Sequence, residues 1–519
     1  MKRRDFLKFG ATGLTVAAVG TMADWPMFWR GSRAFASSLG SGHLELDMVE
    51  ATAEMVDGIR VPMWAFKLAD DDHSSLVGAR IPGPVLVALE GDRIELHLTN
   101  HITQGGAHGF AIPGVSLTVE GNTVSQVTIP PDGDDVHIEF TAPAAGTYMY
   151  LDPLNAPVNR VMGLHGALVV LPNPVGNNTP YSGLSGSSAV QRLFDDLGTA
   201  DHFPGNPWDP SRNAVWVFNV IDPNKAAAAT AGAGAISPAT FLGGFLPQYF
   251  TINGKSGFFS AQHNHGGGAG EEEHDDHTLE NALPLADGLF DAQGNISIRG
   301  TVGQPIVIRS LNAGLMWNSP HIHGNHVYPI AHANALDGRR DILTNLTMLD
   351  TWTLAPGDIK DLLLPFIQPP DIPADRWPPV QELFPLVFPM HDHNEISNTA
   401  AGGNYPQGMA THWQIDGPFD PTDPATAVIT VEQAELRAKT GQLLLEGRCS
   451  VPNIVLDVHA GGGSGPAINR NIRVGADGRF SFRGRALKAL ASRFVTMMHH
   501  DPADPSLVHA TRTVPLRLR

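Results

Sequence analysis

Short runs of alternating apolar and polar residues recur along most of the chain, and Gly, Pro or Asn interrupts nearly every run. The 519 residues include 55 Gly and 41 Pro, and breaks at this frequency favour short strands over long helices. The stretch PVLVALEGDRIELHLTN, residues 84–100, reads as two alternating strands around a Glu-Gly-Asp turn. The pattern therefore predicts an all-β protein built from β-sandwiches.

The runs fall into three units. The first spans residues 43–172, and a linker rich in Gly, Ser, Asp and Pro follows it. The second unit, residues 212–418, repeats the plan of the first, with ISIRGTVGQPIVIRSLN as its strand pair and LVFPMHDHN as its closing strand. Residues 425–519 show alternating strands without a chemical motif, and we expect them to form a separate immunoglobulin-like β-sandwich.

The N-terminus is typical of an export signal. Arg3 and Arg4 precede a short, Gly-containing apolar run that is too short to span a bilayer, and Ala34–Ala36 is a candidate cleavage site. This order resembles a twin-arginine signal over residues 1–36, which predicts a periplasmic protein. The alternative is a basic N-terminal tail on a cytosolic protein. No later stretch has the length and hydropathy expected of a membrane span.

Charge and cysteine content exclude several functions. A formal net charge of −18 repels nucleic acid and anionic lipid, so we expect no nucleic-acid partner. Cys449 is the single cysteine, which excludes an internal disulfide and a copper–thiolate centre built on a histidine-flanked cysteine. Because Cys449 lies far from any histidine cluster in the sequence, we interpret it as a small buried residue.

Two His-x-His pairs stand in strand-like runs, His321 with His323 and His391 with His393. Side chains alternate between the two faces of a strand, so the histidines of a pair point one way and Asp392 points the other. Two imidazoles on one face can hold one metal ion, or one ion each of a close pair. The spacing therefore predicts a histidine-ligated metal site, with Asp392 serving a different pocket.

Several motifs, taken in order, resemble the signatures of the multicopper oxidase superfamily of linked cupredoxin domains. They are IPGPVLVALEGDRIELHLTN, GTYMY with GLHGALVV, SPHIHGNHVYPI, DTWTLAPGD, and HDHNEIS followed by YPQGM. The resemblance covers roughly residues 43–418 and implies two cupredoxin-like Greek-key β-sandwich domains. The arrangement of two repeats is similar to that of the two-domain laccases and copper nitrite reductases. This similarity implies an interdomain copper site and a possible homotrimer.

The resemblance carries the third histidine pair of the family onto His321 and His323, and the fourth onto His391 and His393. These four residues are the expected metal ligands. We expect each pair to lie on one strand, with the two strands facing each other across the domain boundary. The ligand count suits one or two copper ions, and zinc or manganese are alternatives.

The other two pairs of the family are degraded. Leu151 and Pro153 stand where the second pair belongs, and neither side chain binds metal. Of the first pair only His108 remains, with Gly106 at its partner's position. His108 is therefore a fifth candidate ligand, and a structural role for it is equally compatible with the sequence.

The blue type 1 copper site of the family is altered at three positions. Asp392 replaces the cysteine, while Asn318 and Ser397 stand where the two histidines belong, which leaves only Met409 at the axial position. Without a thiolate the resemblance implies no blue copper. The pocket either holds a hard cation such as Ca²⁺ or Mn²⁺ or is a hydrogen-bonded polar patch.

The segment HNHGGGAGEEEHDDH, His263–His277, mixes imidazoles with carboxylates in a Gly-rich context. It could capture Cu²⁺, Zn²⁺ or Ni²⁺ weakly, and a solvated loop without metal is the alternative. His165 and His326, taken singly, are interpreted as structural residues.

Two functions remain open on these observations. The first is a copper-dependent oxidoreductase whose interdomain metal binds O₂, a nitrogen oxide or a phenolic substrate directly. The second is an exported non-catalytic binding or scaffold protein that retains the cupredoxin fold. The loss of the type 1 ligands favours the second function, and the retention of two histidine pairs favours the first.

Replacing Arg3 and Arg4 by Lys is expected to block export, because a twin-arginine receptor recognises the two guanidinium groups as an address. Cell fractionation with immunoblotting measures the effect, and Lys8→Arg serves as the control that leaves the arginine pair intact. Export of the Lys-Lys variant at the full level would contradict the assignment.

Overall fold

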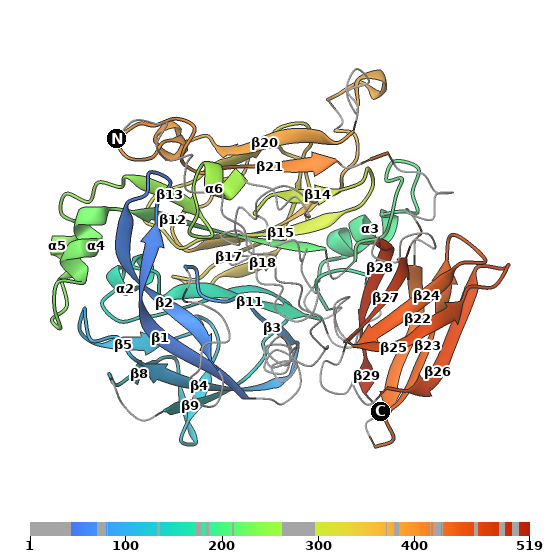
Figure 1. Ribbon diagram of the computed structural model, residues 1–519, viewed down its shortest axis with the longest axis horizontal. Helices are drawn as coiled ribbons and strands as arrows, with labels where there is room; N and C mark the ends of the chain where they lie inside the picture. Colours follow the sequence, from blue (N-terminus) through green and yellow to red (C-terminus); the bar gives the residue numbers. More distant parts are fainter. Residues whose placement is uncertain are drawn as a thin grey trace, which may run out of the picture.

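The structure is a computed structural model, shown in Figure 1. It describes residues 43–518 apart from residues 70–78, 80, 132–134, 173–177, 183–185, 210–211, 262–295, 370, 378–383, 416, 419–426, 428, 438, 461–465, 487–493 and 501–507. The export signal expected at residues 1–36 and the segment His263–His277 therefore lie outside the described residues. No helix in the described part is long and apolar enough to cross a membrane.

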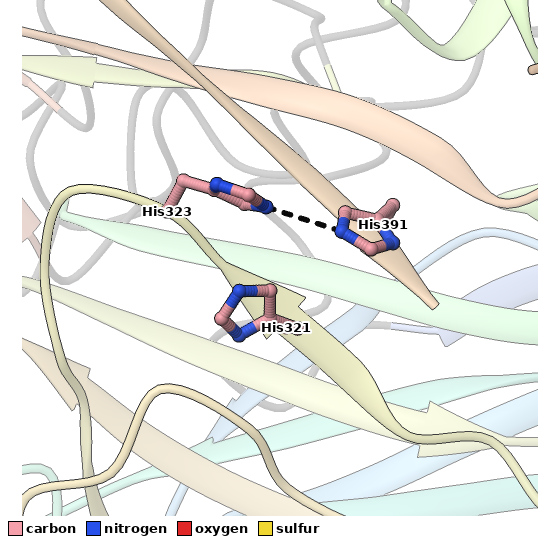
Figure 2. Close-up of side chains that lie close together, drawn as sticks. All are labelled: His321, His323 and His391. Carbon is pink, nitrogen blue, oxygen red and sulfur yellow. Dashed lines mark hydrogen bonds between the residues drawn. The ribbon is translucent and has the colours of Figure 1, made fainter. Parts of the chain in front are cut away.

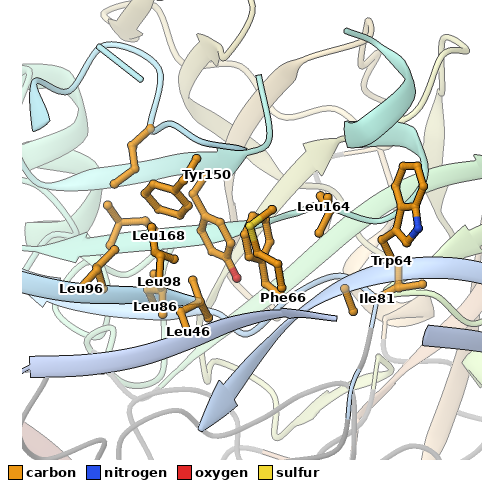
Figure 3. Close-up of a cluster of buried hydrophobic side chains, with 14 of the residues drawn as sticks. Leu46, Trp64, Phe66, Ile81, Leu86, Leu96, Leu98, Tyr150, Leu164 and Leu168 are labelled. Atoms are coloured by element: carbon orange, nitrogen blue, oxygen red, sulfur yellow. The ribbon is translucent and has the colours of Figure 1, made fainter. Parts of the chain in front are cut away.

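The first domain has a six-stranded sheet of order β2-β1-β4-β9-β6-β7 and a three-stranded sheet of order β10-β11-β3. Apolar side chains such as Leu46, Phe66 and Leu168 fill the space between them (Figure 3). Along β4 the apolar residues face this core and the polar residues face away, as alternation predicts. The strands are β1 (His43–Glu54), β2 (Arg60–Ala69), β3 (Leu86–Leu89), β4 (Arg93–Asn100), β5 (His108–Phe110), β6 (Leu117–Val119), β7 (Asn122–Val124), β8 (Val127–Ile129), β9 (Val136–Thr141), β10 (Gly146–Leu151) and β11 (His165–Leu171).

The second domain has a six-stranded sheet of order β13-β12-β15-β19-β17-β18 and a four-stranded sheet of order β14-β21-β20-β16. Its core includes Trp216, Trp352 and Trp413. The strands are β12 (Asn213–Ile221), β13 (Tyr249–Ile252), β14 (Ile298–Gly300), β15 (Ile306–Asn312), β16 (Pro320–Ile322), β17 (Tyr328–Asn334), β18 (Arg340–Ile342), β19 (Asp358–Leu364), β20 (Leu386–Asp392) and β21 (Ala410–Ile415).

The two domains share one strand order. In both six-stranded sheets the second and third strands pair in parallel, β1 with β4 and β12 with β15. The smaller sheets also correspond, because β10-β11-β3 matches β20-β21-β14. The internal repeat and the all-β class expected from the sequence are therefore confirmed. This correspondence places β10 of the first domain where β20 lies in the second.

The third unit consists of two four-stranded sheets, β26-β23-β22-β29 and β25-β24-β27-β28. They enclose a separate apolar core that contains Cys449, whose thiol is buried, as expected. The arrangement is a β-sandwich, and its immunoglobulin-like topology stays a prediction. The strands are β22 (Ile429–Arg437), β23 (Gln442–Cys449), β24 (Val455–Ala460), β25 (Ala467–Arg473), β26 (Arg479–Arg485), β27 (Phe494–His500), β28 (Val508–Pro515) and β29 (Arg517–Leu518).

Short helices occupy the connections. Ser187 caps α3 by accepting a hydrogen bond from the Val190 N–H, and Asp222 caps α4, which begins at Pro223. The apolar face of α3 packs on the six-stranded sheet of the second domain. The helical segments are α2 (Val158–Val161), α3 (Ser188–Asp196), α4 (Pro223–Ala229), α5 (Pro238–Leu242), α6 (Phe258–Ala261), and the 3₁₀ segments η2 (Ala374–Arg376) and η3 (Glu395–Asn398).

An apolar layer joins the first two domains. Met149 and Leu151 of β10 pack in one cluster with Val217 of β12 and Leu311 of β15. A buried polar group lies at the same boundary: the Arg309 guanidinium donates to Thr147 Oγ1 at 2.8 Å and to Asp361 Oδ2 at 3.2 Å. The Asp361 carboxylate also accepts from Thr147 and Tyr181.

Arg309→Leu is expected to destabilise the fold by about 3–5 kcal/mol, because it leaves the buried Asp361 carboxylate without its cation. Arg309 and Asp361 are 0% and 2% exposed. Urea denaturation followed by tryptophan fluorescence measures the change. The exposed pair Arg339–Asp337 provides the control, since Arg339→Leu should leave the midpoint almost unchanged. Equal effects of the two substitutions would contradict this account.

Candidate metal centre

The register of two short strands brings the candidate ligands together. Strand β16 pairs with β20 in antiparallel fashion, and His321 lies directly opposite His391. His323 and His393 follow one residue after the ends of these strands. Alternation turns all four imidazoles to one face, while Ile322 and Met390 point into the core at 1% and 0% exposure.

The four imidazole rings converge. The His321 ring centroid lies 4.6 Å from both His323 and His393 and 5.5 Å from His391, and His391 lies 5.3 Å from His393. Figure 2 shows His323 and His391 pointing toward each other, with 3.1 Å between their Nε2 atoms. One nitrogen from each of His321, His323 and His391 lies within 4.8 Å of the others. Ligand nitrogens around one zinc ion lie about 3.3–3.4 Å apart, so small rotations of these side chains would bring the three nitrogens around one metal ion.

Carbonyl and hydroxyl groups fix the orientation of two of the rings. His321 Nδ1 lies 3.1 Å from the Asp350 carbonyl and 3.0 Å from Thr351 Oγ1, and His391 Nδ1 lies 3.1 Å from the Asp392 carbonyl. A proton donated from Nδ1 leaves Nε2 as the free base, which is the tautomer that a metal requires. Asp350 and Thr351 begin the DTWTLAPGD motif, but sequence reasoning did not assign them to the site.

A glycine and a tryptophan fix the turn after His323. Gly324 has φ of 74°, and a Cβ there would approach the Phe388 ring to 2.5 Å. Trp413 Nε1 donates to the His323 carbonyl at 2.7 Å. The local sequence His-Gly therefore sets the angle at which the His323 ring leaves the strand.

The site favours neutral imidazoles. Burial is the largest effect on His321 and lowers its pKa. The neighbouring His391 and His393 lower this pKa further, and the Asp350 carboxylate opposes the decrease. For His323, burial again lowers the pKa most, followed by the three neighbouring imidazoles. Protonation of neighbouring rings would place positive charges side by side, so the imidazoles tend to stay neutral. A neutral imidazole is the form that binds a metal cation.

One expectation about the site is wrong. The two histidine-bearing strands do not face each other across the domain boundary, because β16 and β20 are hydrogen-bonded neighbours in one sheet of the second domain. His323 is exposed, so the centre opens to the surface. Sequence spacing predicted the face of each pair correctly but not the pairing of the two strands.

The structure does not bring His108 to this cluster. His108 lies on β5 of the first domain, is fully buried, and contacts Trp64 edge-on. Its Nδ1 lies 3.0 Å from Asp152 Oδ2, and its Nε2 lies 2.9 Å from the Gln104 carbonyl. Because hydrogen bonds occupy both ring nitrogens, the geometry favours the structural role for His108. His165 has a similar role, since its buried Nδ1 lies 2.7 Å from the Arg160 carbonyl.

Leu151 and Pro153 occupy, in the first domain, the positions that correspond to His391 and His393. Leu151 is 6% exposed and belongs to the apolar layer between the domains. A leucine there contributes to domain packing, which gives a physical reason for the loss of an imidazole at that position.

The residues expected at the type 1 positions gather on the core side of the same strand. Asp392, Asn318, Ser397 and Met409 are all 0–1% exposed. The Asp392 N–H donates to the Met409 carbonyl at 3.2 Å, and the Met409 N–H donates to the Ser397 carbonyl at 2.7 Å. The four residues therefore form one buried group, directly behind the histidine cluster.

Asp392 is only partly satisfied in this pocket. Its Oδ1 accepts from the Ser319 N–H at 2.9 Å and the Asn394 N–H at 2.8 Å. Its Oδ2 and both side-chain polar atoms of Asn318 have no hydrogen-bond partner among the described residues. Burial raises the pKa of Asp392, and the two backbone N–H groups and the Ser397 hydroxyl act against this rise. The pocket is thus polar and free of thiolate.

Parts of the chain are similar in sequence to known copper proteins. The multicopper oxidase family profile matches residues 63–174. A copper-containing nitrite reductase of Alcaligenes xylosoxydans xylosoxydans is 34% identical over 131 residues, which span 24% of this chain and 39% of that reductase. An L-ascorbate oxidase of Cucumis sativus is 32% identical over 109 residues, 20% of this chain and 18% of the oxidase. The first domain is therefore similar in sequence to multicopper oxidases, as the motifs predicted, and the chain spans no more than 39% of the length of either relative.

The profile match covers the first domain, whereas the four converging histidines lie in the second. Among solved structures, the blue copper oxidase from Nitrosomonas europaea has a TM-score of 0.45 at 20% identity, covering 72% of this chain and 85% of that structure. The four histidines are candidate ligands on the basis of their geometry and motifs alone.

In metal-free protein, His321 and His323 are expected to titrate below the ordinary imidazole value of 6.5. As the pH falls, these histidines are protonated in the unfolded chain before they are protonated in the folded protein. Their contribution to the free energy of unfolding should therefore be fully present above pH 6.5 and decrease as the pH drops below this value. NMR of ¹⁵N-histidine, assigned with His321→Gln and His323→Gln, measures the titration. Titration of either ring above 6.5 would contradict the prediction.

Proposed function

We propose that this protein is an exported copper-binding oxidoreductase whose metal is held by His321, His323, His391 and His393 of the second domain. The observation that carries the proposal is the convergence of four imidazoles on one face of a sheet, with three donor nitrogens within 4.8 Å. Export over the twin-arginine route to the periplasm rests on residues 1–36 alone.

The residues present fit copper. Imidazole nitrogens suit copper and also zinc, and the lowered pKa of His321 and His323 keeps these two ligands neutral. Four imidazoles are enough for one ion, or for two ions with open positions. A bound copper ion would supply one-electron redox chemistry and a Lewis-acidic position for a small ligand.

The pocket around Asp392 does not fit a blue copper ion. Blue sites require a thiolate, and the Asp392 carboxylate, Asn318 and Ser397 offer oxygen or amide groups instead. The unpartnered Asp392 Oδ2 keeps a hard cation such as Ca²⁺ or Mn²⁺ as an alternative to an empty polar patch. Without a second redox centre, we infer that electrons or substrate reach the histidine-bound copper directly.

The surroundings of the cluster support direct access. His323 and His393 are exposed, and Trp317 near the start of β16 is 64% exposed. A small oxidant or reductant such as O₂, a nitrogen oxide or a phenol could therefore reach the imidazoles from solvent. An exposed tryptophan also offers a flat apolar surface against which an aromatic substrate could stack.

In a homotrimer, a neighbouring subunit would supply no further imidazole from the positions that the family uses in its first domain. Leu151 and Pro153 have replaced one pair, and both ring nitrogens of His108 are engaged by hydrogen bonds. The four histidines of the second domain are therefore the whole ligand set that we propose, in any oligomeric state.

A non-catalytic role is the second candidate, and the same loss of ligands from the first domain favours it. Leu151 now contributes to the contact between domains rather than to chemistry. In that case the protein would keep the cupredoxin fold as an exported binding or scaffold protein. The two candidate functions differ in whether the copper-bound protein converts a substrate.

The double variant His391→Ala/His393→Ala is expected to lose stoichiometric Cu²⁺ binding, with affinity reduced more than about 100-fold, since even an indirect change at a metal site costs about 10- to 100-fold. Isothermal titration measures the affinity. Circular dichroism should show an unchanged fold, because the core side chains of this sheet are untouched. His202→Ala, at a 67% exposed histidine beside Asp196, is the matched control.

Turnover separates the two functions. Copper-loaded wild type should oxidise a phenolic probe with O₂, or reduce nitrite with electrons from an added reductant, and the double variant should do neither. Stoichiometric copper without turnover of any of these probes would favour the scaffold role. Equal copper binding by wild type and the double variant would overturn the proposed centre itself.

A further inference from the structure

A second group of metal-binding side chains lies in the first domain, on the outer face of its six-stranded sheet. Strands β1, β4 and β9 are adjacent, and Glu45, His97 and His137 stand opposite one another across them. Leu96 and Leu98 of β4 turn toward the core (Figure 3), so Glu95 and His97 turn to the opposite face. Asp135, just before β9, completes the group.

Both imidazoles place one nitrogen beside Asp135. His97 Nδ1 lies 3.0 Å from Asp135 Oδ2 and 3.1 Å from Glu45 Oε1, and His137 Nε2 lies 3.6 Å from the same Asp135 oxygen. Thr99 Oγ1 donates to the other Asp135 oxygen at 3.2 Å. A carboxylate that accepts the N–H of an imidazole fixes its tautomer and leaves the opposite nitrogen as a base.

The opposite nitrogens converge on one further carboxylate. His97 Nε2 lies 3.4 Å from Glu95 Oε1, and His137 Nδ1 lies 3.8 Å from the same oxygen. The two ring centroids are 3.8 Å apart. With Nδ1 of His97 as the donor, a lone pair of Nε2 faces a carboxylate oxygen, and this contact is repulsive unless a proton or a cation lies between them.

The electrostatic balance of the group favours a cation. Three carboxylates surround His97, whose side chain is 12% exposed, and that of Glu45 is 6% exposed. Among the described residues, only imidazoles form ion pairs with Glu95 and Asp135. The two imidazole rings are tilted by 41°, and the three carboxylates leave the group with a net negative charge when both rings are neutral. A divalent cation would neutralise it and leave both rings neutral.

We propose that Glu95, His97 and His137 form a divalent transition-metal site, with Asp135 and Glu45 orienting the two imidazoles. Two imidazoles and one carboxylate are a donor set that suits Zn²⁺, with the remaining position open to water. Tetrahedral zinc ligands about 2.0–2.2 Å from the ion lie roughly 3.3–3.6 Å apart, close to the 3.4 and 3.8 Å seen here. The bound ion ties β4 to β9.

Zinc titration of the full chain tests this site in a background that lacks the histidine cluster of the second domain. In His391→Ala/His393→Ala protein, isothermal titration should show one Zn²⁺ whose affinity falls at least about 100-fold on adding His137→Ala or Glu95→Gln. These side chains are 58% and 44% exposed, so neither substitution should unfold the sandwich. His202→Ala, at a histidine beside a single carboxylate, should leave the affinity unchanged.

Asp135→Asn separates a metal site from an ordinary ion-pair network. As a residue that orients ligands, it should retain one Zn²⁺ per chain with about 10- to 100-fold weaker binding. Zinc should also raise the melting temperature of the background protein but not that of its His137→Ala variant. Weak binding by the segment His263–His277 would be common to all variants and would not affect these differences. Identical zinc affinity in the background, His137→Ala and Glu95→Gln proteins would overturn the proposal.

Discussion

The antiparallel register of β16 and β20 is the constraint on which the candidate centre depends. Pairing His321 with His391 sends four imidazoles to one face and Ile322, Met390 and Asp392 to the other. A slip of one residue in either strand would place that strand's histidines in the apolar core and its core side chains outside. The hydrophobic packing of the second domain therefore fixes the geometry of the candidate metal ligands.

The two repeated domains have diverged from one plan. Strand β10 of the first domain corresponds to β20 of the second, but its Leu151 packs against the second domain where His391 binds metal in our proposal. The first domain thus buries Leu151, whereas His391 at the corresponding position of the second domain is only partly buried. This asymmetry confines the proposed metal ligands to a single sheet of the second domain, whereas the multicopper oxidase profile matches the first domain.

Much of this arrangement could be predicted from sequence, because alternation along a strand is local. The all-β class, the repeat and the common face of each His-x-His pair follow from period-two patterns. Pairing between strands is not local. The spacing of residues in the sequence did not show that β16 and β20 are neighbouring strands. It also did not show that His97 and His137 pair across β4 and β9, because 39 residues lie between them. The hydrogen bond between His108 Nδ1 and the Asp152 carboxylate could not be predicted either, since it joins β5 to the residue that follows β10.

The most direct test of the central claim is X-ray absorption at the copper edge of copper-loaded protein. The account predicts a first shell of nitrogen or oxygen ligands with outer-shell scattering from three or four imidazoles, and no sulfur at the short distance of a thiolate. The imidazole signal should disappear in His391→Ala/His393→Ala protein. A short copper–sulfur distance, or an imidazole signal that survives this double substitution, would contradict the account.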